Sequence, residues 1–426
     1  MCGIAGFIDL SLEKTKAENV IGEMLLAIKH RGPDHTGFQI YEDGVVLGHN
    51  RLSIIDLSEV GNQPFEYKHL SITYNGEIYN YKEIKKELED LGHRFRSETD
   101  TEVILAAFEE WGENCVERFL GMWAFAIWDK NRRELFCSRD RFGIKPFFYT
   151  WIRGCFYFAS EIKALKKVAG FDPSMDEDMV NMYLHMGWNT FGEKTCYRNV
   201  FQIEQATNLV LKDGVVIRKN RYWDLDVKKR IEGISEEDAI KGFKELFEES
   251  IRLHMRSDVP VGALLSGGID SSSIVSTVAA LYPEVNLDTF SIYYTSERGM
   301  DERPFINAVA AKYQNIHSEQ KEPLEEEILG RMKYFFEDQD LPLLGSGFIS
   351  NFLVLEMAKK KGLKVLLDGQ GADEYLVGYL RSFFRIVGQN PLSIKKWRMF
   401  KSHLDREGYG MKERIQRVIK VGLSVI

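Results

Sequence analysis

The sequence is poor in cysteine and proline, and it contains no long hydrophobic run. Its five cysteines in 426 residues are too few and too scattered for a disulfide framework, and none stands in a spacing typical of zinc. An odd number of cysteines fits a reducing compartment, and no stretch approaches the roughly 20 apolar residues of a membrane span. The N-terminus also lacks the basic and apolar segments of a signal peptide. We therefore expect a cytoplasmic protein with no membrane partner.

Positive charge is also scarce. The chain has 56 Lys and Arg against 64 Asp and Glu, a net charge of −8 and a pI near 5.7. Binding to a nucleic-acid duplex requires a strongly cationic surface, so no nucleic-acid partner is expected. Residues 381–426 are different, with eleven basic residues against three acidic ones, and we interpret them as a solvated helical face.

The first half of the chain has the pattern of a layered α+β domain. Its composition, 44% hydrophobic and 28% charged residues, is that of a globular protein, and the length of 426 residues fits two large domains. In residues 2–210 short strands dominate, and a few helices stand between them. The clearest of these elements are the strands Met122–Trp128 and Glu134–Cys137 and the helices Tyr81–Leu91 and Thr101–Glu110.

The second half has a different pattern. The hairpin signal Asp213-Gly214 and the polar segment 211–234 predict a linker, and Ser235 is suited to cap a long amphipathic helix. Strands and helices then alternate through residues 235–426, which predicts βαβ units around a parallel sheet. The expected elements are strands Val261–Leu265, Thr289–Tyr293 and Lys364–Leu367 and helices Ser271–Leu281 and Arg303–Lys312.

Cys2 follows the initiator methionine directly. Methionine is normally removed before a small residue, which would place a thiol and a free α-amine on one residue. The reference pKa values are about 7.7–8.0 for the amine and about 8.5 for the thiol, so the amine can take the thiol proton near neutral pH. The alternative is that Cys2 is only a small residue at the start of a strand.

Other segments of the first domain favour the catalytic interpretation. The pair Asn75-Gly76 is expected to form a turn after strand Ser71–Tyr74. Together with Cys2, these segments resemble the class II glutamine amidotransferase domain, an N-terminal-nucleophile hydrolase whose fold is a layered αββα sandwich. The segments that carry the resemblance are His30–Asp34, Gly48–Asp56, Asn75–Glu77, Thr99–Glu102 and Ser138–Pro146.

The resemblance assigns roles to individual residues. Cys2 attacks the side-chain amide of glutamine and forms a thioester, and the Asn75 side chain and the Gly76 N–H form the oxyanion hole. The arginine of the binding set holds the carboxylate of glutamine, and its two acidic residues hold the α-ammonium. The implied glutamine-binding residues are Arg51, Leu52, Ser53, Ile54, Ile55, Asn75, Gly76, Glu77 and Asp100.

The second domain contains the segment Ser266–Ser272, which reads SGGIDSS directly after an apolar strand. A glycine turn between a strand and a helix presents backbone N–H groups to an anion, and glycines let the main chain approach phosphate closely. Neither the Walker A pattern nor a GxGxxG fingerprint is present. The segment resembles the PP-loop of ATP pyrophosphatases.

This second resemblance implies an ATP site with Mg²⁺ held by Asp270 and Asp373, because hard oxygen donors suit that ion. Gln370 lies beside the acyl-adenylate in this analogy. Asp368 stands where the family usually has Ser or Thr, and its carboxylate would repel phosphate unless it binds metal or points away. The implied ATP-binding residues are Leu265, Ser266, Gly267, Gly268, Asp270, Ser271, Ile292, Asp368 and Gly369.

The order of the two domains resembles the glutamine-hydrolysing asparagine synthetase family over nearly the whole chain. The resemblance implies glutamine, ATP and aspartate as substrates and is compatible with a homodimer. Members of this family continue well beyond the position of Glu374 through a motif with a catalytic lysine, for which this sequence has no candidate. We therefore expect either a fragment or a shortened relative, which hydrolyses glutamine but forms little asparagine.

Two alternatives stay open at this point. The same chemistry could amidate a sugar or polysaccharide carboxylate, since the acceptor pocket would be built largely from loops near Gly345–Gly347 and from the missing segment. A protein of another class, a glutaminase or glutamine-binding module without synthetase activity, would also retain Cys2 and its neighbours. The PP-loop argues against that second alternative.

Overall fold

The computed structural model describes residues 1–295, 301–343, 347–376, 379, 394 and 398. Most of the basic segment 381–426 and of the loop 345–347 lie outside these residues. The chain divides into two compact units. The first unit comprises residues 1–262 and 320–366, and the second comprises residues 263–319 and 367–426.

The first unit contains an eight-stranded sheet in which every strand pair with a defined register is antiparallel. Strand β1 (Gly3–Ile8) lies inside it, hydrogen-bonded to β3 on one side and to β9 on the other. The strands, in spatial order, are β10 (Thr190–Phe191), β11 (Lys194–Thr195), β12 (Val200–Gln202), β8 (Phe148–Ile152), β9 (Cys155–Ala159), β1, β3 (Val45–Arg51) and β2 (His35–Ile40).

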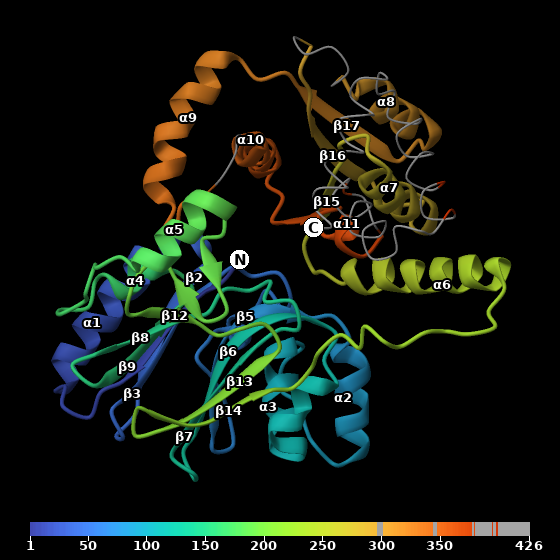
Figure 1. Ribbon diagram of the computed structural model, residues 1–426. Coiled ribbons are helices and arrows are strands. Elements are labelled where there is room, and N and C mark those ends of the chain that lie inside the picture. The colour runs from blue at the N-terminus through green and yellow to red at the C-terminus, as the bar shows by residue number, and fades with distance from the viewer. Residues whose placement is uncertain (296–300, 344–346, 377–378, 380–393, 395–397, 399–426) are drawn as a thin grey trace. The chain divides into compact units, whose positions relative to one another are not determined.

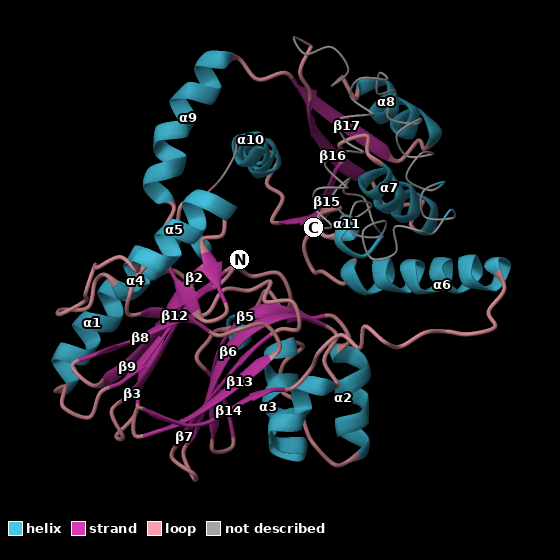
Figure 2. Ribbon diagram, in the orientation of Figure 1, coloured by secondary structure: helices cyan, strands magenta, loops and turns pink. Residues whose placement is uncertain are grey.

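A second, six-stranded antiparallel sheet packs on the first (Figure 2). Its edge strand β14 follows β13 through the two-residue turn Asp213-Gly214, where both residues have positive φ (51° and 80°). This is the hairpin that the sequence predicted. The strands, in spatial order, are β14 (Val215–Arg221), β13 (Thr207–Lys212), β7 (Glu134–Arg139), β6 (Gly121–Asp129), β5 (Leu70–Ile78) and β4 (Phe65–Tyr67).

The alternation of side chains along each strand builds three apolar layers. In β1, Ile4 and Ile8 face the space between the sheets, whereas Ala5 and Phe7 face the helices on the outer side. Strand β6 alternates in the same way, so both strands are buried on both faces. The layers helix, sheet, sheet, helix confirm the predicted αββα sandwich (Figure 1).

Helices cover both outer faces of the sandwich. Helix α1 packs on the eight-stranded sheet and α3 on the six-stranded sheet, each through buried aliphatic residues. The helices Tyr81–Leu91 and Thr101–Glu110 were predicted almost to the residue. The helices of the first unit are α1 (Lys14–Ala27), α2 (Tyr81–Asp90), α3 (Asp100–Trp111), α4 (Ile162–Leu165), α5 (Glu177–Met186), α6 (Glu236–His254), α9 (Glu325–Asp338) and α10 (Gly347–Lys360).

The prediction of a turn at Asn75-Gly76 was wrong. Strand β5 continues through this pair to Ile78, because Asn75 and Gly76 pair with Ala124 and Trp123 of β6. A Cβ on Gly76 would lie 2.3 Å from the Met122 carbonyl oxygen, so glycine is required here by close backbone contact and not by a turn.

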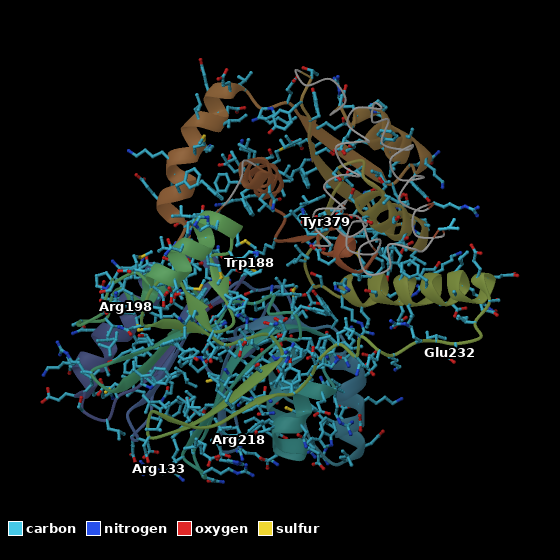
Figure 3. All side chains as sticks on the ribbon, viewed as in Figure 1. Arg133, Trp188, Arg198, Arg218, Glu232 and Tyr379 are labelled. Carbon is cyan, nitrogen blue, oxygen red and sulfur yellow. The ribbon has the colours of Figure 1, made fainter. Side chains whose placement is uncertain are left out.

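The region predicted as a linker is partly a strand. Residues 215–221 form β14, so the six-stranded sheet continues past residue 210. Its side chains are mostly exposed, as at Arg218 (Figure 3), which forms an ion pair with Glu113 at 2.5 Å. Ser235 caps α6 as predicted, its hydroxyl accepting a hydrogen bond from the Asp238 N–H at 3.1 Å.

A four-stranded sheet forms the centre of the second half of the chain, in the order β17, β16, β15, β18. Strands β15 and β16 are parallel, as predicted, and α7 packs on β16. Strand β17 was not predicted, because its sequence IHSEQK lacks an apolar pattern. The elements are β15 (Val261–Leu264), α7 (Ile269–Leu281), β16 (Leu287–Ile292), α8 (Arg303–Lys312), β17 (Ile316–Lys321), β18 (Val365–Leu367) and α11 (Ala372–Leu376).

No helix within the described ranges is both long enough and apolar enough to span a bilayer.

Candidate active site

Cys2 immediately precedes the buried strand β1, and its main chain is held by an arginine. The Arg31 Nε donates to the Cys2 carbonyl oxygen at 2.9 Å, and the Arg31 Nη1 donates to Glu161 at 2.7 Å. Burial opposes ionisation of Glu161, but the hydrogen bond from His30 and the charge of Arg31 lower its pKa to about 2. Glu161 is therefore a stable anion that fixes Arg31 on the nucleophile's backbone.

The thiol of Cys2 contacts the backbone of Leu52, the residue after β3. The Leu52 N–H donates to Cys2 Sγ at 3.4 Å, and the Leu52 carbonyl oxygen lies 3.7 Å from the same sulfur. Burial raises the pKa of the thiol, and the Leu52 hydrogen bond opposes this effect. Desolvation lowers the pKa of the neighbouring Met1 ammonium to about 6. A neutral amine and a protonated thiol therefore lie side by side.

Asn75 presents an unused hydrogen-bond donor. Its side chain is only 1% exposed, and its Nδ2 has no hydrogen-bond partner in the described part of the chain. A buried donor without a partner costs about 1–3 kcal/mol, and a ligand oxygen that accepts from it would recover that free energy. This geometry suits a donor that binds an oxygen atom when negative charge develops on it during a reaction.

Two carboxylates, of the buried Asp100 and the half-buried Glu77, lie close enough for the charge of one to affect the other. The Asp100 Oδ2 accepts hydrogen bonds from the Tyr74 hydroxyl at 2.8 Å and from the Ile78 N–H at 2.9 Å. Burial raises the pKa of Asp100 to about 6. Burial and the charge of Asp100 together raise the pKa of Glu77 to about 7. Two carboxylates whose pKa values are raised in this way favour the binding of a cation.

Asp100 occupies a different place from a helix cap. Thr99 is the N-cap of α3, its hydroxyl accepting from the Glu102 N–H at 3.2 Å. Asp100 is the first helical residue, and its carboxylate points to β5 through Tyr74 and Ile78.

Arg51, at the end of β3, is buried with 5% exposure. Its Nη1 donates to the Ser58 carbonyl at 2.7 Å and to Asn62 at 2.9 Å, and its Nη2 donates to the Asp56 carbonyl. No ion pair with an acidic side chain neutralises it among residues 1–295, 301–343 and 347–376. The guanidinium therefore retains a charge that can bind a carboxylate.

The predicted binding segment Leu52–Ile55 follows Arg51 and is half-buried. Besides the Leu52 contact with the thiol, the Ser53 N–H donates to Asp34 at 2.8 Å. The structure thus brings the predicted glutamine-site residues onto the ends of β1, β3 and β5 and the start of α3. Sequence reasoning assigned no role to Arg31, Tyr74 and Lys145, although the charged turn at 30–34 and the segment 138–146 were both singled out.

The predicted nucleotide loop lies between β15 and α7 in the second unit. Gly267 has a φ of +83°, and the Ser266 hydroxyl lies 2.9 Å from the Ser271 hydroxyl and accepts from the Gly268 N–H at 3.3 Å. Leu265 is buried, and its N–H donates to the Phe290 carbonyl at 3.0 Å. The loop is therefore a rigid turn at the N-terminus of a thirteen-residue helix.

A second loop, after β18, approaches this turn. A Cβ on Gly369 would lie 3.0 Å from the Ser271 nitrogen and 3.2 Å from Asp270 Cβ. Burial raises the pKa of Asp270, and the charge of Asp373 raises it further, so the two carboxylates are close. Ile292 ends the parallel strand β16 at the same edge of the sheet. The Asp368 carboxylate accepts hydrogen bonds from the N–H groups of Gly369 and Gln370.

Comparison with known proteins identifies the family of each half of the chain. A family model described as glutamine amidotransferase domain matches residues 1–223, and one described as asparagine synthase matches residues 242–420. The chain is 38% identical to the putative asparagine synthetase [glutamine-hydrolyzing] 2 of Methanocaldococcus jannaschii, covering 93% of this chain and 81% of that protein. The chain belongs to the glutamine-hydrolysing asparagine synthetase family.

Other relatives in this family are longer. Asparagine synthetase [glutamine-hydrolyzing] 1 of Bacillus subtilis is 36% identical over 95% of this chain, which spans 62% of that protein. Amidase chyE of Penicillium rubens is 31% identical over 89% of this chain, which spans 59% of that protein. The chain thus covers about three fifths of the length of these two relatives.

Asn75→Ala tests the unused donor. We expect kcat for glutamine hydrolysis to fall about 10²- to 10³-fold, because the donor acts on the oxyanion and not on the substrate. Thermal unfolding should change little, since Nδ2 has no partner to lose. Asn208→Ala is the matched control, because the Asn208 amide is also buried without a partner. A kcat within threefold of wild type for Asn75→Ala would contradict the assignment.

The pH dependence of KM tests the carboxylate pair. Glu77 and Asp100 have pKa values raised to about 7 and about 6, so each becomes neutral as the pH falls through its own value. We expect the KM for glutamine to rise as the pH falls below about 7 and to rise more steeply below about 6. Steady-state glutaminase assays across this range measure it, and a flat KM would show that neither carboxylate binds the substrate.

Proposed function

We propose that this protein hydrolyses glutamine at Cys2 and uses the ammonia to convert an aspartyl-adenylate to asparagine, with ATP converted to AMP and pyrophosphate. The observation that carries the proposal is that the Cys2 thiol directly precedes β1, and that β1 packs against β5, the strand that holds the buried, unpartnered Nδ2 of Asn75. Membership of the asparagine synthetase family supports the second half of the reaction.

The glutaminase reaction follows from these residues. After removal of Met1, the free α-amine of Cys2 takes the thiol proton, and the thiolate attacks the amide carbon of glutamine. The Asn75 side chain and the Gly76 N–H stabilise the oxyanion. Ammonia leaves with the transferred proton, and water hydrolyses the thioester to release glutamate.

Substrate recognition uses the charges around this centre. Arg51 binds the α-carboxylate of glutamine, and Glu77 and Asp100 bind the α-ammonium. The segment Leu52–Ile55 lines the remaining side.

The second site would bind ATP. The backbone N–H groups of residues 266–268 and the N-terminus of α7 suit the pyrophosphate. Leu265 and Ile292 would line the nucleotide pocket with Asp368 and Gly369. The hydrogen bonds of Asp368 to its own loop support an orientation in which the carboxylate does not meet phosphate.

The residues around the loop also fit a magnesium ion. The Asp270 and Asp373 carboxylates are close together, and neither forms an ion pair with a basic group in the described ranges. Two carboxylates with water and phosphate oxygens are a usual set for Mg²⁺. Bound there, the ion would neutralise charge on the phosphates, and Gln370 would lie beside the acyl-adenylate.

The domain division remains part of the proposal. The sequence predicted a glutaminase domain at residues 2–210, a linker at 211–234 and a synthetase domain at 235–426, and because β13 and β14 extend the first domain's sheet to Arg221, we limit the proposed linker to residues 222–234. We also propose a cytoplasmic location, which the five free cysteines support.

The proposal is tested with glutamine labelled with ¹⁵N in its side-chain amide. The protein is incubated with this glutamine, ATP, Mg²⁺ and a panel of carboxylic acids, including aspartate and a uronic acid, and AMP and labelled products are scored by mass spectrometry. Labelled asparagine with AMP, formed from aspartate alone and in small amount, is the expected result. Product from another acid would exclude aspartate as the substrate, and glutamate without AMP would exclude the synthetase reaction.

Cys2→Ala should abolish glutamine hydrolysis and leave ATP binding unchanged, because nucleophile and nucleotide loop belong to different units. Cys155→Ala, which removes another partly buried thiol, should retain full activity. Glutamate release within tenfold of wild type for Cys2→Ala would exclude Cys2 as nucleophile. Intact-mass analysis should show that active protein begins at Cys2, and retained Met1 in active material would contradict the use of its α-amine.

Asp270→Asn should weaken ATP binding in the presence of Mg²⁺ by about tenfold and eliminate pyrophosphate release, since a neutral amide is a poor ligand for a hard cation. Glutamine hydrolysis should be retained. Glu284→Gln, an exposed residue of the same unit, is the control. An unchanged ATP affinity across a magnesium titration would refute the metal assignment.

A further inference from the structure

The segment 138–146 is folded around the buried carboxylate of Asp140. The Asp140 Oδ1 accepts from the N–H groups of Phe142 at 3.0 Å and Ile144 at 2.9 Å. Its Oδ2 accepts from the N–H groups of Lys145 at 3.0 Å and Trp123 at 3.2 Å. The carboxylate thus determines the path of the chain up to Lys145 and ties it to β6.

Arg139 fixes the same segment from the other side. Its Nε donates to the Lys145 carbonyl at 2.8 Å, and its Nη2 donates to the Gly143 carbonyl at 2.7 Å. Gly143 has a φ of +65°, which lets the chain turn back toward Arg139. The backbone of Lys145 is therefore held at both its N–H and its C=O, and the side chain has a defined starting point.

The Lys145 side chain is buried but poorly paired. The residue is 6% exposed, and its Nζ contacts the sulfur of Met1 at 3.3 Å. A thioether is a weak acceptor, and the described residues contain no ion pair between Lys145 and a carboxylate. Burying an ammonium without a strong partner is expensive. Removal of Met1 would also remove the thioether, so the ammonium must be stabilised by charges at a longer distance.

Those charges belong to the glutaminase site. Burial lowers the pKa of the Lys145 ammonium; the charges of Glu77, Cys2 and Asp140 oppose this effect, whereas that of Arg31 adds to it. Seen from Glu77, Asp100 of α3 opposes ionisation, and Lys145 and the amino terminus favour it. Lys145 is therefore the side chain whose charge offsets the effect of Asp100 on Glu77.

We propose that Lys145 is a positioning residue of the glutaminase site, whose ammonium keeps Glu77 ionised and available to the α-ammonium of glutamine. This inference rests on the proposed glutamine site. It gives the segment 138–146 a function, namely to hold one buried cation at a fixed place beside Glu77.

Lys145→Met tests the inference, because methionine keeps the length and apolar stem of lysine and removes its charge. We expect the KM for glutamine at pH 7 to rise about tenfold with kcat changed less than about threefold. The pH at which KM begins to rise should move upward by about one unit, because Glu77 loses its countercharge. Lys145→Arg should keep the wild-type pH at which KM rises, and Lys167→Met, an exposed residue, is the control.

A double-mutant cycle with Glu77→Gln separates this role from a structural one. If Lys145 acts through Glu77, Lys145→Met should not raise KM further in the Glu77→Gln background. Additive effects, or an unchanged KM profile in the single variant, would overturn the inference. If thermal unfolding shows that Lys145→Met is not folded, Lys145→Gln is tested by the same criteria.

The result is distinguishable from failure of the proposed function. Wild-type protein must first hydrolyse glutamine, and Cys2→Ala must lose this activity. Absence of wild-type hydrolysis would overturn the proposed function. Wild-type hydrolysis with a Lys145→Met variant that behaves as wild type would overturn only the role of Lys145.

Discussion

Two hydrogen bonds between the sheets fix strand β3 against strand β5, and the geometry of the candidate active site depends on them. The Thr73 hydroxyl donates to the Gly48 carbonyl at 2.8 Å, and the His49 Nε2 lies 3.0 Å from the Tyr74 carbonyl. Burial lowers the pKa of His49 to about 3, so the ring is neutral and its hydrogen bond does not depend on pH near 7. Because β3 pairs with β1 and β5 carries Asn75, the bonds help to determine the position of Cys2 relative to Asn75.

A candidate nucleophile at the second residue must be held in place by other parts of the chain. Chain ends are usually poorly ordered unless a sheet or a side chain holds them. Here β1 is paired on both sides, Arg31 binds the Cys2 carbonyl, and Leu52 binds the thiol. The candidate active site is consequently built on backbone that the two sheets hold in place.

The electrostatics of the site follow from its burial. Burial raises the pKa of both Asp100 and Glu77, and the charge of Asp100 raises the pKa of Glu77 further. Arg51 and Lys145 supply positive charge, but neither forms an ion pair with a carboxylate within the ranges that the structure describes. A zwitterionic amino acid complements this distribution, since its carboxylate suits the arginine and its ammonium suits the two acids.

The sequence was sufficient for a layered α+β fold, because the apolar strand Met122–Trp128 and the helical periodicity of Tyr81–Leu91 are visible in the residues themselves, whereas the αββα arrangement came from the family resemblance. It was not sufficient where contacts between distant parts of the chain determine the local structure. Asn75-Gly76 has the composition of a turn, yet β6 lies close enough to require the glycine and continue the strand. Strand β17 is polar and was missed, since its pairing with β16 depends on the backbone and not on an apolar pattern.

The residues of the candidate site were likewise only partly predictable from the sequence. Cys2, Arg51 and Asp100 were identified through a family resemblance, whereas spacing alone left each with an ordinary structural explanation. Lys145 could not be assigned from sequence, because its position results from the hydrogen bonds of Asp140 and Arg139 to its backbone. No local sequence pattern shows that the segment 138–146 brings the charge of Lys145 near Glu77, which lies 68 positions earlier in the chain.

The central claim is that the Cys2 thiol and the Asn75 amide act on the same carbonyl group. A crystal structure of the protein alkylated by a diazoketone analogue of glutamine tests it most directly, since the ketone oxygen then occupies the position of the amide oxygen. The account predicts a covalent bond to Cys2 Sγ and a ketone oxygen about 3 Å from both Asn75 Nδ2 and the Gly76 nitrogen. A ketone oxygen directed away from Asn75, or alkylation at another cysteine, would contradict it.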